Sequence, residues 1–231
     1  MMSMLSGTIR KLLGRSEGRE ALLVKEPPDA RGIGEHAMVI KQFQDLMAVK
    51  KAPSVLELGT KRSQAERCTM HRDWVPHAGE FVGSDFDAGL DVDVVADVHK
   101  LSDVFGENRF DAIVSCSVFE HVQYPWVAVV ELCRVLKQGG LVFVQTHQAF
   151  PLHAYPFDYW RFSTEALKTL FSEQVGFKVI GAEYVFRAKI VSERDPAAAN
   201  YPSYLNVHVL AEKIAHPPAD FRWQPHLQAM P

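Results

Sequence analysis

The sequence lacks the features that mark several specialised classes of protein. Its 231 residues include only three cysteines, an odd number with no C-x-x-C spacing, so neither a disulfide framework nor a structural zinc site is expected. No apolar run approaches the roughly 18 residues that a membrane span needs. Basic and acidic residues nearly balance, at 25 against 28, which argues against a nucleic-acid partner. We therefore expect a cytoplasmic protein with no membrane span.

The N-terminal segment is amphipathic and lacks the uninterrupted apolar core of a signal peptide. A helix there would place Leu5, Ile9, Leu12 and Leu13 on one face, with basic residues nearby. Such a helix either packs on the domain or a partner subunit, or lies on a membrane surface. We favour packing, and we expect a second helix from His36 to Lys50.

From Ser54 onward the chain consists of short apolar runs, rich in β-branched residues and bounded by turns. Near-continuous apolar strands are expected where helices cover both faces of a sheet. The pattern therefore predicts a doubly wound α/β domain with about seven strands. The predicted strands are VLEL, EFVGSD, DVDVVAD, FDAIVSCS, GLVFVQT, FKVIGAEYV and SYLNVHVLAEK.

The segments between these strands predict the crossover helices. Residues 61–71 are expected to form the first one, and the link at 86–90 is too short for a full helix. Residues 125–136 predict a clear helix with a proline in its first turn. Another helix is expected from Ser163 or Thr164, both suitable N-caps, to Leu170.

Acidic residues follow three of the predicted strands. Glu57, Asp85 and Asp97 would meet in one crevice, because ligands of such folds bind at the carboxyl ends of the strands. A ligand with a ribose diol and an amino group would suit them. Each acid has a structural alternative, since Glu57 could cap the next helix and the two aspartates could be turn residues. Because both aspartates directly follow apolar strands, we favour the interpretation that they bind a ligand.

Four segments resemble the class I S-adenosylmethionine-dependent methyltransferases, and in particular their small-molecule, type-11-like group: VLELGTKRS, VGSDFDAGLDVDVVADVHKL, FDAIVSCSVFEHV and ELCRVLKQGGLVFVQT. The resemblance implies one Rossmann-like methyltransferase domain with an antiparallel final strand, and S-adenosylmethionine as cofactor. It divides the chain into an N-terminal helical cover (1–53), a catalytic domain (54–212) and an irregular tail (213–231).

The resemblance also implies a cofactor site at the strand ends. Gly59 would let the backbone approach the methionine part, and Asp85 would accept both ribose hydroxyls. Asp97 and the Val98 N–H would contact the adenine, with His121 over the site. The implied cofactor-binding residues are Glu57, Gly59, Thr60, Lys61, Ser63, Asp85, Phe86, Asp97, Val98, Ser115, Val118 and His121.

The first loop departs from the family pattern. Lys61 and Ser63 stand where the family usually has two further glycines. A dinucleotide site is disfavoured as well, because the second and third glycines of G-x-G-x-x-G, counted from Gly59, are replaced by Lys61 and Gln64.

Residues 147–163 are the most unusual stretch, with two His, an Asp, an Arg and six aromatic residues. They resemble the H-x-x-P-x-D-Y-[FW]-R-[FY]-[ST] segment of one type-11-like branch, which is often associated with bacterial glycan or secondary-metabolite pathways. The segment follows the fifth strand, so it lies on the predicted active-site edge. For a general base we predict His153 first, then Asp158, then His147, because a hydroxyl acceptor gains from a base and imidazole titrates near neutrality.

The same segment predicts a substrate site. Tyr155, Tyr159 and Trp160 would form an aromatic wall for a sugar or ring, and Arg161 would clamp an acidic group. Structurally, Asp158 and Arg161 could instead be an ion pair that fixes the loop, with Trp160 and Phe162 in the core. A metal held by His147, His153 and Asp158 lacks the usual ligand spacing, so no metal is expected.

The sequence therefore predicts a methyltransferase that acts on a small molecule or sugar, at oxygen, and that could form a homodimer. One alternative is the same fold with a nitrogen or carbon acceptor. Another is a catalytically silent, cofactor-binding partner protein, which the altered loop at 61–63 would favour.

Overall fold

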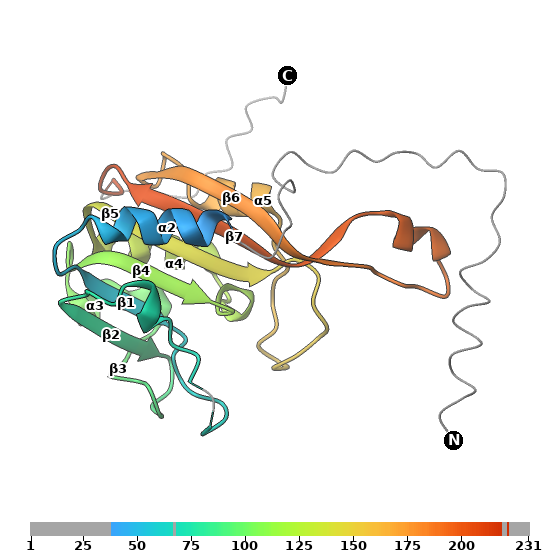
Figure 1. The fold of residues 1–231 in the computed structure, drawn as a ribbon, viewed down its shortest axis with the longest axis horizontal. Coiled ribbons are helices and arrows are strands. Elements are labelled where there is room, and N and C mark those ends of the chain that lie inside the picture. The colour runs from blue at the N-terminus through green and yellow to red at the C-terminus, as the bar shows by residue number, and fades with distance from the viewer. Residues whose placement is uncertain (1–37, 67, 219–220, 222–231) are drawn as a thin grey trace.

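The computed structural model describes residues 38–66, 68–218 and 221, and these form one seven-stranded sheet (Figure 1). The strand order is β3-β2-β1-β4-β5-β7-β6. Strands β1 to β5 pair in parallel, whereas β7 is antiparallel to both of its neighbours. This confirms the predicted doubly wound sheet with an antiparallel final strand. The strands are β1 (Ser54–Leu58), β2 (Glu80–Asp85), β3 (Val94–Val95), β4 (Phe110–Cys116), β5 (Leu136–His147), β6 (Phe177–Ala188) and β7 (Ser203–Lys213).

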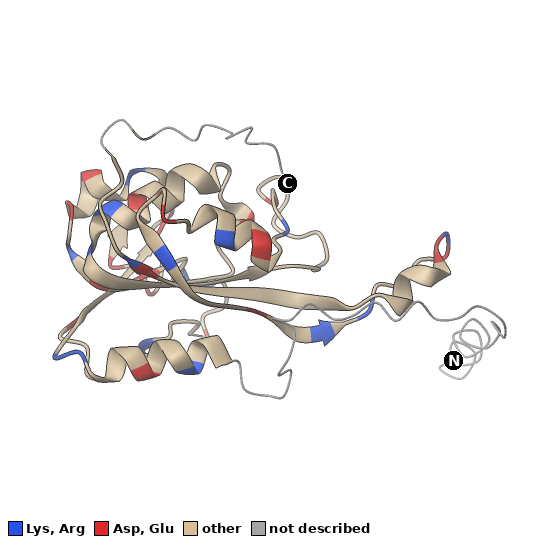
Figure 2. Ribbon diagram, turned by 90° about the horizontal axis from the view of Figure 1, so that it is seen from above, with Lys and Arg blue, Asp and Glu red and all other residues tan. Residues whose placement is uncertain are grey.

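Helices cover both faces of the sheet. Helix α2 (Met38–Ala48) lies on one face, and α3 (Leu101–Phe105), α4 (Pro125–Val135) and α5 (Thr164–Leu170) lie on the other (Figure 2). The helices expected at 125–136 and 163–170 are thus present, and the one expected at 36–50 is present over 38–48 of its described residues. The predicted cap of α5 is also correct, because the Ser163 hydroxyl accepts from the backbone N–H of Ala166 at 3.1 Å.

The alternation of side chains along the central strands builds two hydrophobic cores. On β4, Ile113 packs into the cluster that contains Leu132 of α4, while Val114 packs into the cluster that contains Phe43 of α2. All four side chains are fully buried. Burial on both faces explains why the predicted strands are apolar without interruption.

The predicted helix over residues 61–71 is wrong. Among its described residues, 61–66 and 68–71, there is no helical residue, and only a short 3-10 turn follows at Arg72–Trp74. The reason lies in tertiary contacts that pull the backbone away from a helical path. The Lys61 N–H donates to Asp85, the Arg62 N–H donates to the carbonyl of Leu90, and the Arg62 guanidinium forms two hydrogen bonds to Asp91.

The register of the sheet aligns the strand ends that matter for function. Leu58, the last residue of β1, pairs with Ser84 of β2 on one side and with Ser115 of β4 on the other. The loops that follow these three strands therefore start at one level of the same edge.

Strands β6 and β7 extend beyond the rest of the sheet as a two-stranded arm (Figure 1). A 3-10 turn, Pro196–Asn200, lies between them. The predicted N-terminal amphipathic helix and the segment after residue 221 lie outside the described residues. Within the described part of the chain, no helix is long and apolar enough to cross a bilayer.

Candidate active site

The loop after β1 makes a close approach to the end of β4. Gly59 has a φ of +75°, and its N–H donates to the carbonyl of Ser84 at 2.8 Å. A side-chain Cβ at this position would collide with Cγ2 of Val118. Glycine is therefore required both for the backbone conformation and for the contact.

Asp85 lies at the end of β2 with its carboxylate held in place by backbone donors. Oδ2 accepts from the Lys61 N–H at 3.0 Å, and Oδ1 accepts from the Asp87 N–H at 3.3 Å. The Lys61 ammonium pairs with Asp87 at 2.9 Å, so Lys61 reaches Asp85 through its backbone alone. A carboxylate fixed in this way retains lone pairs for a diol.

Glu57 is buried, and His71 occupies both of its oxygens. The His71 backbone N–H donates to Oε2 at 2.9 Å, and the His71 ring Nδ1 lies 2.6 Å from Oε1. His71 directly precedes the 3-10 turn at 72–74. Glu57 therefore anchors the long loop between β1 and β2.

Asp97 caps the 3-10 turn that starts at Val98. Its Oδ1 accepts from the backbone N–H of His99 at 2.9 Å and lies 2.7 Å from the His99 ring Nδ1. Burial alone would raise the pKa of Asp97, but the hydrogen bonds from His99 lower the pKa below its usual range. Asp97 thus carries its negative charge next to the end of β3.

Three hydroxyls at the same edge are buried and have no hydrogen-bond partner among the described residues. They belong to Thr60 after β1, Ser84 in β2 and Ser115 in β4. Buried polar groups are nearly always satisfied by protein, water or ligand. These hydroxyls therefore indicate a site that a polar ligand or water completes.

The remaining predicted cofactor residues occupy the rim. Val98 and Val118 are half-buried, whereas Ser63 and Phe86 are exposed, Phe86 at 72% of its surface. Exposed aromatic rings beside a carboxylate provide a surface on which a planar group can stack.

Glu120 was not among the predicted site residues, yet it is the most deeply buried acid at this edge. Its side chain is 0% exposed. Oε2 accepts from the Thr146 hydroxyl at 2.7 Å, and Oε1 lies 2.9 Å from Nε2 of His147. Burial would raise the pKa of Glu120, but the ion-pair contact with His147 and the hydrogen bond from Thr146 hold the pKa below its usual range. The signal in the sequence was an acid inside the apolar run VFEHV.

His147 ends β5 with both ring nitrogens engaged. Nδ1 lies 2.9 Å from Oδ1 of Asn206, and Nε2 faces Glu120. Burial would lower the pKa of His147, but the contacts with Glu120 and Asn206 raise the pKa above its usual value. The ring also stacks on Phe150, with centroids 4.0 Å apart.

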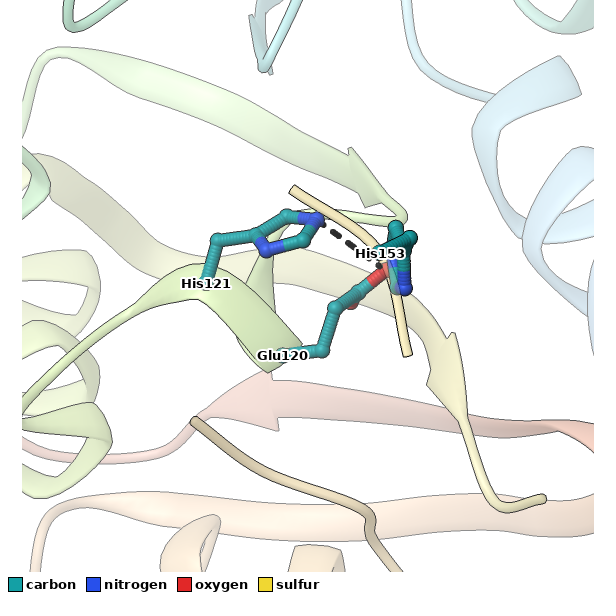
Figure 3. Close-up of side chains that lie close together, drawn as sticks. All are labelled: Glu120, His121 and His153. Carbon is teal, nitrogen blue, oxygen red and sulfur yellow. Dashed lines mark ion pairs between the residues drawn. The ribbon is translucent and has the colours of Figure 1, made fainter. Parts of the chain in front are cut away.

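His121 and His153 lie face to edge beside Glu120, with ring centroids 4.8 Å apart (Figure 3). His121 Nδ1 is 2.8 Å from the carbonyl oxygen of Phe157, and His153 Nδ1 is 3.1 Å from that of Pro151. Carbonyl oxygens only accept, so in both rings Nδ1 carries the proton and Nε2 keeps a lone pair in the neutral form.

The loop that carries His153 is closed by Asp158 and Arg161. Arg161 Nη1 donates to Oδ1 at 2.6 Å, Nη2 donates to Oδ2 at 2.8 Å, and the His153 backbone N–H donates to Oδ2 at 3.0 Å. Hydrogen bonds from the Arg161 guanidinium, and then from the His153 N–H, hold the pKa of Asp158 well below its usual range. Arg161 also donates to the carbonyls of Phe150 and Pro151.

The three predicted substrate-wall residues differ in exposure. Tyr155 is 93% exposed and Tyr159 is 40% exposed. Trp160 is half-buried, packs against the hydrophobic core and lies 6.0 Å from the ring of Trp126.

Comparison with known proteins gives a family match over part of the chain. Residues 32–144 match the family model described as a methyltransferase domain. No curated protein sequence matches the chain. Among solved structures, a SAM-dependent methyltransferase from Archaeoglobus fulgidus is 16% identical, with a TM-score of 0.53 and coverage of 76% of this chain and 93% of that chain.

Two further structures share the fold. A chain of the complex between the Haloferax volcanii Trm112 methyltransferase activator and a methyltransferase is 19% identical, with a TM-score of 0.54 and coverage of 77% of this chain and 89% of that one. The Burkholderia thailandensis 1,6-didemethyltoxoflavin-N1-methyltransferase, solved with S-adenosylhomocysteine, is 14% identical, with a TM-score of 0.51 and coverage of 77% and 79%.

Residues 32–144 thus match a methyltransferase domain, and the described chain has the fold of class I S-adenosylmethionine-dependent methyltransferases. S-adenosylmethionine is the cofactor that accompanies this family. The residues at the strand ends fit this cofactor. Gly59 leaves room where a Cβ would collide, and Asp85 is oriented by backbone donors. The buried hydroxyls of Thr60, Ser84 and Ser115 have no hydrogen-bond partner among the described residues and could bind a polar ligand.

Proposed function

We propose that this protein is an S-adenosylmethionine-dependent methyltransferase that acts on a hydroxyl group of a small molecule or sugar, in a glycan or secondary-metabolite pathway. The observation that carries the proposal is the position of His153. Its ring lies beside His121 and Glu120 at the carboxyl ends of β4 and β5, with the Nε2 lone pair available as a proton acceptor.

On the cofactor side, we propose that Asp85 binds the ribose diol, that Asp97 and the Val98 N–H bind the adenine, and that the loop at Gly59 lies against the methionine part. S-adenosylmethionine, when bound, supplies an electrophilic methyl group. Thr60, Lys61, Ser63, Phe86, Ser115 and Val118 complete this side of the site, with Glu57 as the residue that orders the first loop through His71.

For the acceptor side, we propose His153 as the general base that takes the hydroxyl proton. Asp158 is a poor base, because both of its oxygens bind Arg161 and its pKa is held low. It acts instead as a positioning residue for His153. His147 is assigned to the support of Glu120, since both of its nitrogens are engaged.

Isothermal titration calorimetry with S-adenosylhomocysteine tests the cofactor side. The wild type should bind, and Asp85→Ala should bind at least about tenfold more weakly, because charge-assisted hydrogen bonds contribute about 1.5–3 kcal/mol each. Asp103→Ala, which alters an exposed acid of α3, is the matched control and should bind like the wild type. Absence of wild-type binding would contradict both the enzyme and the silent-partner alternative.

A methyl-transfer screen over hydroxyl-bearing metabolites and sugars tests the acceptor side. With an acceptor in hand, His153→Ala should lower kcat by about 10²–10⁴-fold, the usual contribution of a general base. Affinity for S-adenosylhomocysteine should stay unchanged, and His216→Ala should behave like the wild type. Full turnover in His153→Ala, or a preference for amine acceptors, would overturn the assignment.

We also propose a reducing compartment and a homodimer. The three cysteines are free thiols in the described chain, with Cys68 exposed. The β6–β7 arm exposes Phe186, Val191 and Tyr201, which are suitable for contact with a second copy. Light scattering after size exclusion should report twice the chain mass of 26.0 kDa, and a mass of one chain would contradict the dimer.

A further inference from the structure

Three side chains at the acceptor end of the site form a cluster that the methyl-transfer proposal does not use as a unit. One candidate ligand atom each from Glu120, His121 and His153 lies within 4.8 Å of the other two. Figure 3 shows the three side chains pointing toward one another from two different segments of the chain. Nε2 of His121 and Oε1 of Glu120 are 3.9 Å apart.

The two imidazoles are oriented as metal-binding histidines are. Each directs Nδ1 to a backbone carbonyl, of Phe157 for His121 and of Pro151 for His153. Such an outer hydrogen bond fixes the tautomer and leaves Nε2 as the ligand atom. Two independent loops thus produce the same arrangement.

The carboxylate of Glu120 is also positioned to bind a cation. Glu120 is fully buried, and its Oε2 accepts from the Thr146 hydroxyl at 2.7 Å. Oε1 makes an ion-pair contact with His147 at 2.9 Å but has no hydrogen-bond partner of good geometry in the described chain. This buried oxygen faces the two imidazoles and lacks a well-oriented hydrogen-bond donor. A bound cation would satisfy it.

The spacing suits a transition metal. Tetrahedral coordination with bonds of about 2.0–2.2 Å separates the ligand atoms by about 3.4 Å. The observed separations of 3.9 Å and up to 4.8 Å need only small side-chain rotations to reach this geometry. Two imidazoles with one carboxylate are typical of zinc and of other first-row divalent ions, and not of Mg²⁺ or Ca²⁺.

We propose that Glu120, His121 and His153 bind one divalent first-row transition cation, such as Zn²⁺, in a site with an open coordination position. The side chains of His121 and His153 are 27% and 30% exposed, so solvent reaches both proposed ligands. This set differs from the combination of His147, His153 and Asp158, because Asp158 is bound by Arg161 and His147 supports Glu120.

The site deepens the proposed function, on which its chemical role rests. A cation at this position would bind the acceptor oxygen and lower the pKa of its hydroxyl. In that form His153 is a ligand of the cation through Nε2, so it no longer acts as the general base. The hydroxyl proton then leaves to water, and the oxygen forms the bond to the methyl carbon while the carbon–sulfur bond breaks toward sulfur. The favoured acceptor class is a hydroxyl with a second oxygen beside it, such as a vicinal diol, because such a pair chelates the cation.

Equilibrium dialysis with Zn²⁺ alone tests the site directly. The full chain, without an affinity tag and stripped by a chelator, should bind one Zn²⁺ per chain, and Mg²⁺ at the same concentration should not compete. His121→Ala and His153→Ala should each weaken this binding by at least about tenfold. Loss of a hydrogen bond to a ligand already lowers metal affinity by about 10–100-fold, and these variants remove the ligand itself. His216→Ala, an exposed histidine, is the control for surface binding and should bind like the wild type.

A second measurement guards against loss of folding. Co²⁺ titrated into the wild type should give d–d absorption bands of a four- or five-coordinate ion, and these bands should be absent in His153→Ala while its circular dichroism spectrum is unchanged. Equal Zn²⁺ affinity in the wild type, His121→Ala and His153→Ala would overturn the metal site.

Titration of S-adenosylhomocysteine into the same samples separates the two proposals. Cofactor binding without Zn²⁺ binding would overturn the metal site and leave the proposed methyl transfer intact. Zn²⁺ binding without cofactor binding would support the metal site and contradict the methyl transfer.

Discussion

Asp158 and Arg161 form a bidentate ion pair, with nitrogen–oxygen distances of 2.6 and 2.8 Å, and the same Asp158 carboxylate holds the backbone of His153. The pair therefore fixes the segment that carries the proposed base. The Asp158 side chain is only 4% exposed, so this contact is better shielded from solvent than a surface salt bridge.

This relationship predicts that Arg161 is a positioning residue. Arg161→Ala should lower kcat by about tenfold or more, because His153 would lose its fixed orientation, whereas the affinity for S-adenosylhomocysteine should stay constant. Arg161→Lys should restore only part of kcat, since an ammonium cannot form both contacts. Separate determination of kcat, KM and the Kd of S-adenosylhomocysteine tests this. A parallel loss of cofactor affinity would indicate a general structural role instead.

Gly59 provides a second prediction. Gly59→Ala should weaken S-adenosylhomocysteine binding by at least about tenfold and destabilise the fold by about 1–3 kcal/mol, since the residue has a positive φ and its new Cβ would collide with Val118. Calorimetry and urea unfolding measure the two effects.

The double variant Gly59→Ala/Val118→Ala removes the atom that collides and separates the two causes. It should recover part of the lost stability relative to Val118→Ala alone, with the cost of the positive φ remaining. No recovery at all would show that the contact with Val118 does not limit this position.

The sequence predicted the sheet well because the strands are buried on both faces and read as apolar runs. Helix α4 was predictable for a local reason as well, its proline at the N-terminus. The conformation of the segment at 61–71 was not predictable. Asp85 accepts from the backbone of Lys61, 24 residues away, and Asp91 accepts from the side chain of Arg62, 29 residues away. Contacts at that range leave no periodic signal in the sequence.

The positions of two acids at this edge were predictable for the same reason as the strands, since Asp85 ends one apolar run and Asp97 follows another, whereas Glu57 lies inside β1. The part of the site proposed to bind the methyl acceptor, around residues 147–163, was only partly predictable. The composition of 147–163 marked the loop, but which of its residues turn inward depends on hydrogen bonds such as those of Tyr159 and Trp160 to the carbonyl of Glu120. Glu120 was not predicted as a site residue, because the sequence pattern assigned its neighbour His121 to the cofactor.

A third prediction concerns the face of the sheet that α2 covers. Phe43 is fully buried, with its ring 6.3 Å from that of Trp74 and 5.9 Å from that of Phe143. Phe43→Ala should therefore lower the free energy of unfolding by about 3–5 kcal/mol through the cavity that it leaves. Met38→Ala, at a residue 65% exposed in the same helix, should change it by less than about 0.5 kcal/mol. Equal, small effects in urea unfolding would mean that α2 is not packed on the sheet.

The last prediction uses the pH dependence of stability at Asp111, which joins β4 to β1. Its Oδ2 accepts from the Ser54 N–H, the Ser54 hydroxyl and the Lys137 ammonium, each at 2.8 Å. Burial would raise the pKa of Asp111, but the hydrogen bonds from Lys137 and Ser54 lower the pKa below its usual range. Because the folded pKa lies below the unfolded value of about 3.9, the carboxylate stabilises the fold above that pH.

This stabilisation should be lost as the pH falls from about 4 through the folded pKa of Asp111. Asp111→Asn should therefore be less stable than the wild type at pH 7, and the difference should shrink at pH 3. Urea unfolding of both proteins at the two pH values measures the change. A difference that stays constant with pH would mean that the charge of Asp111 does not contribute, and that only its hydrogen-bonding shape matters.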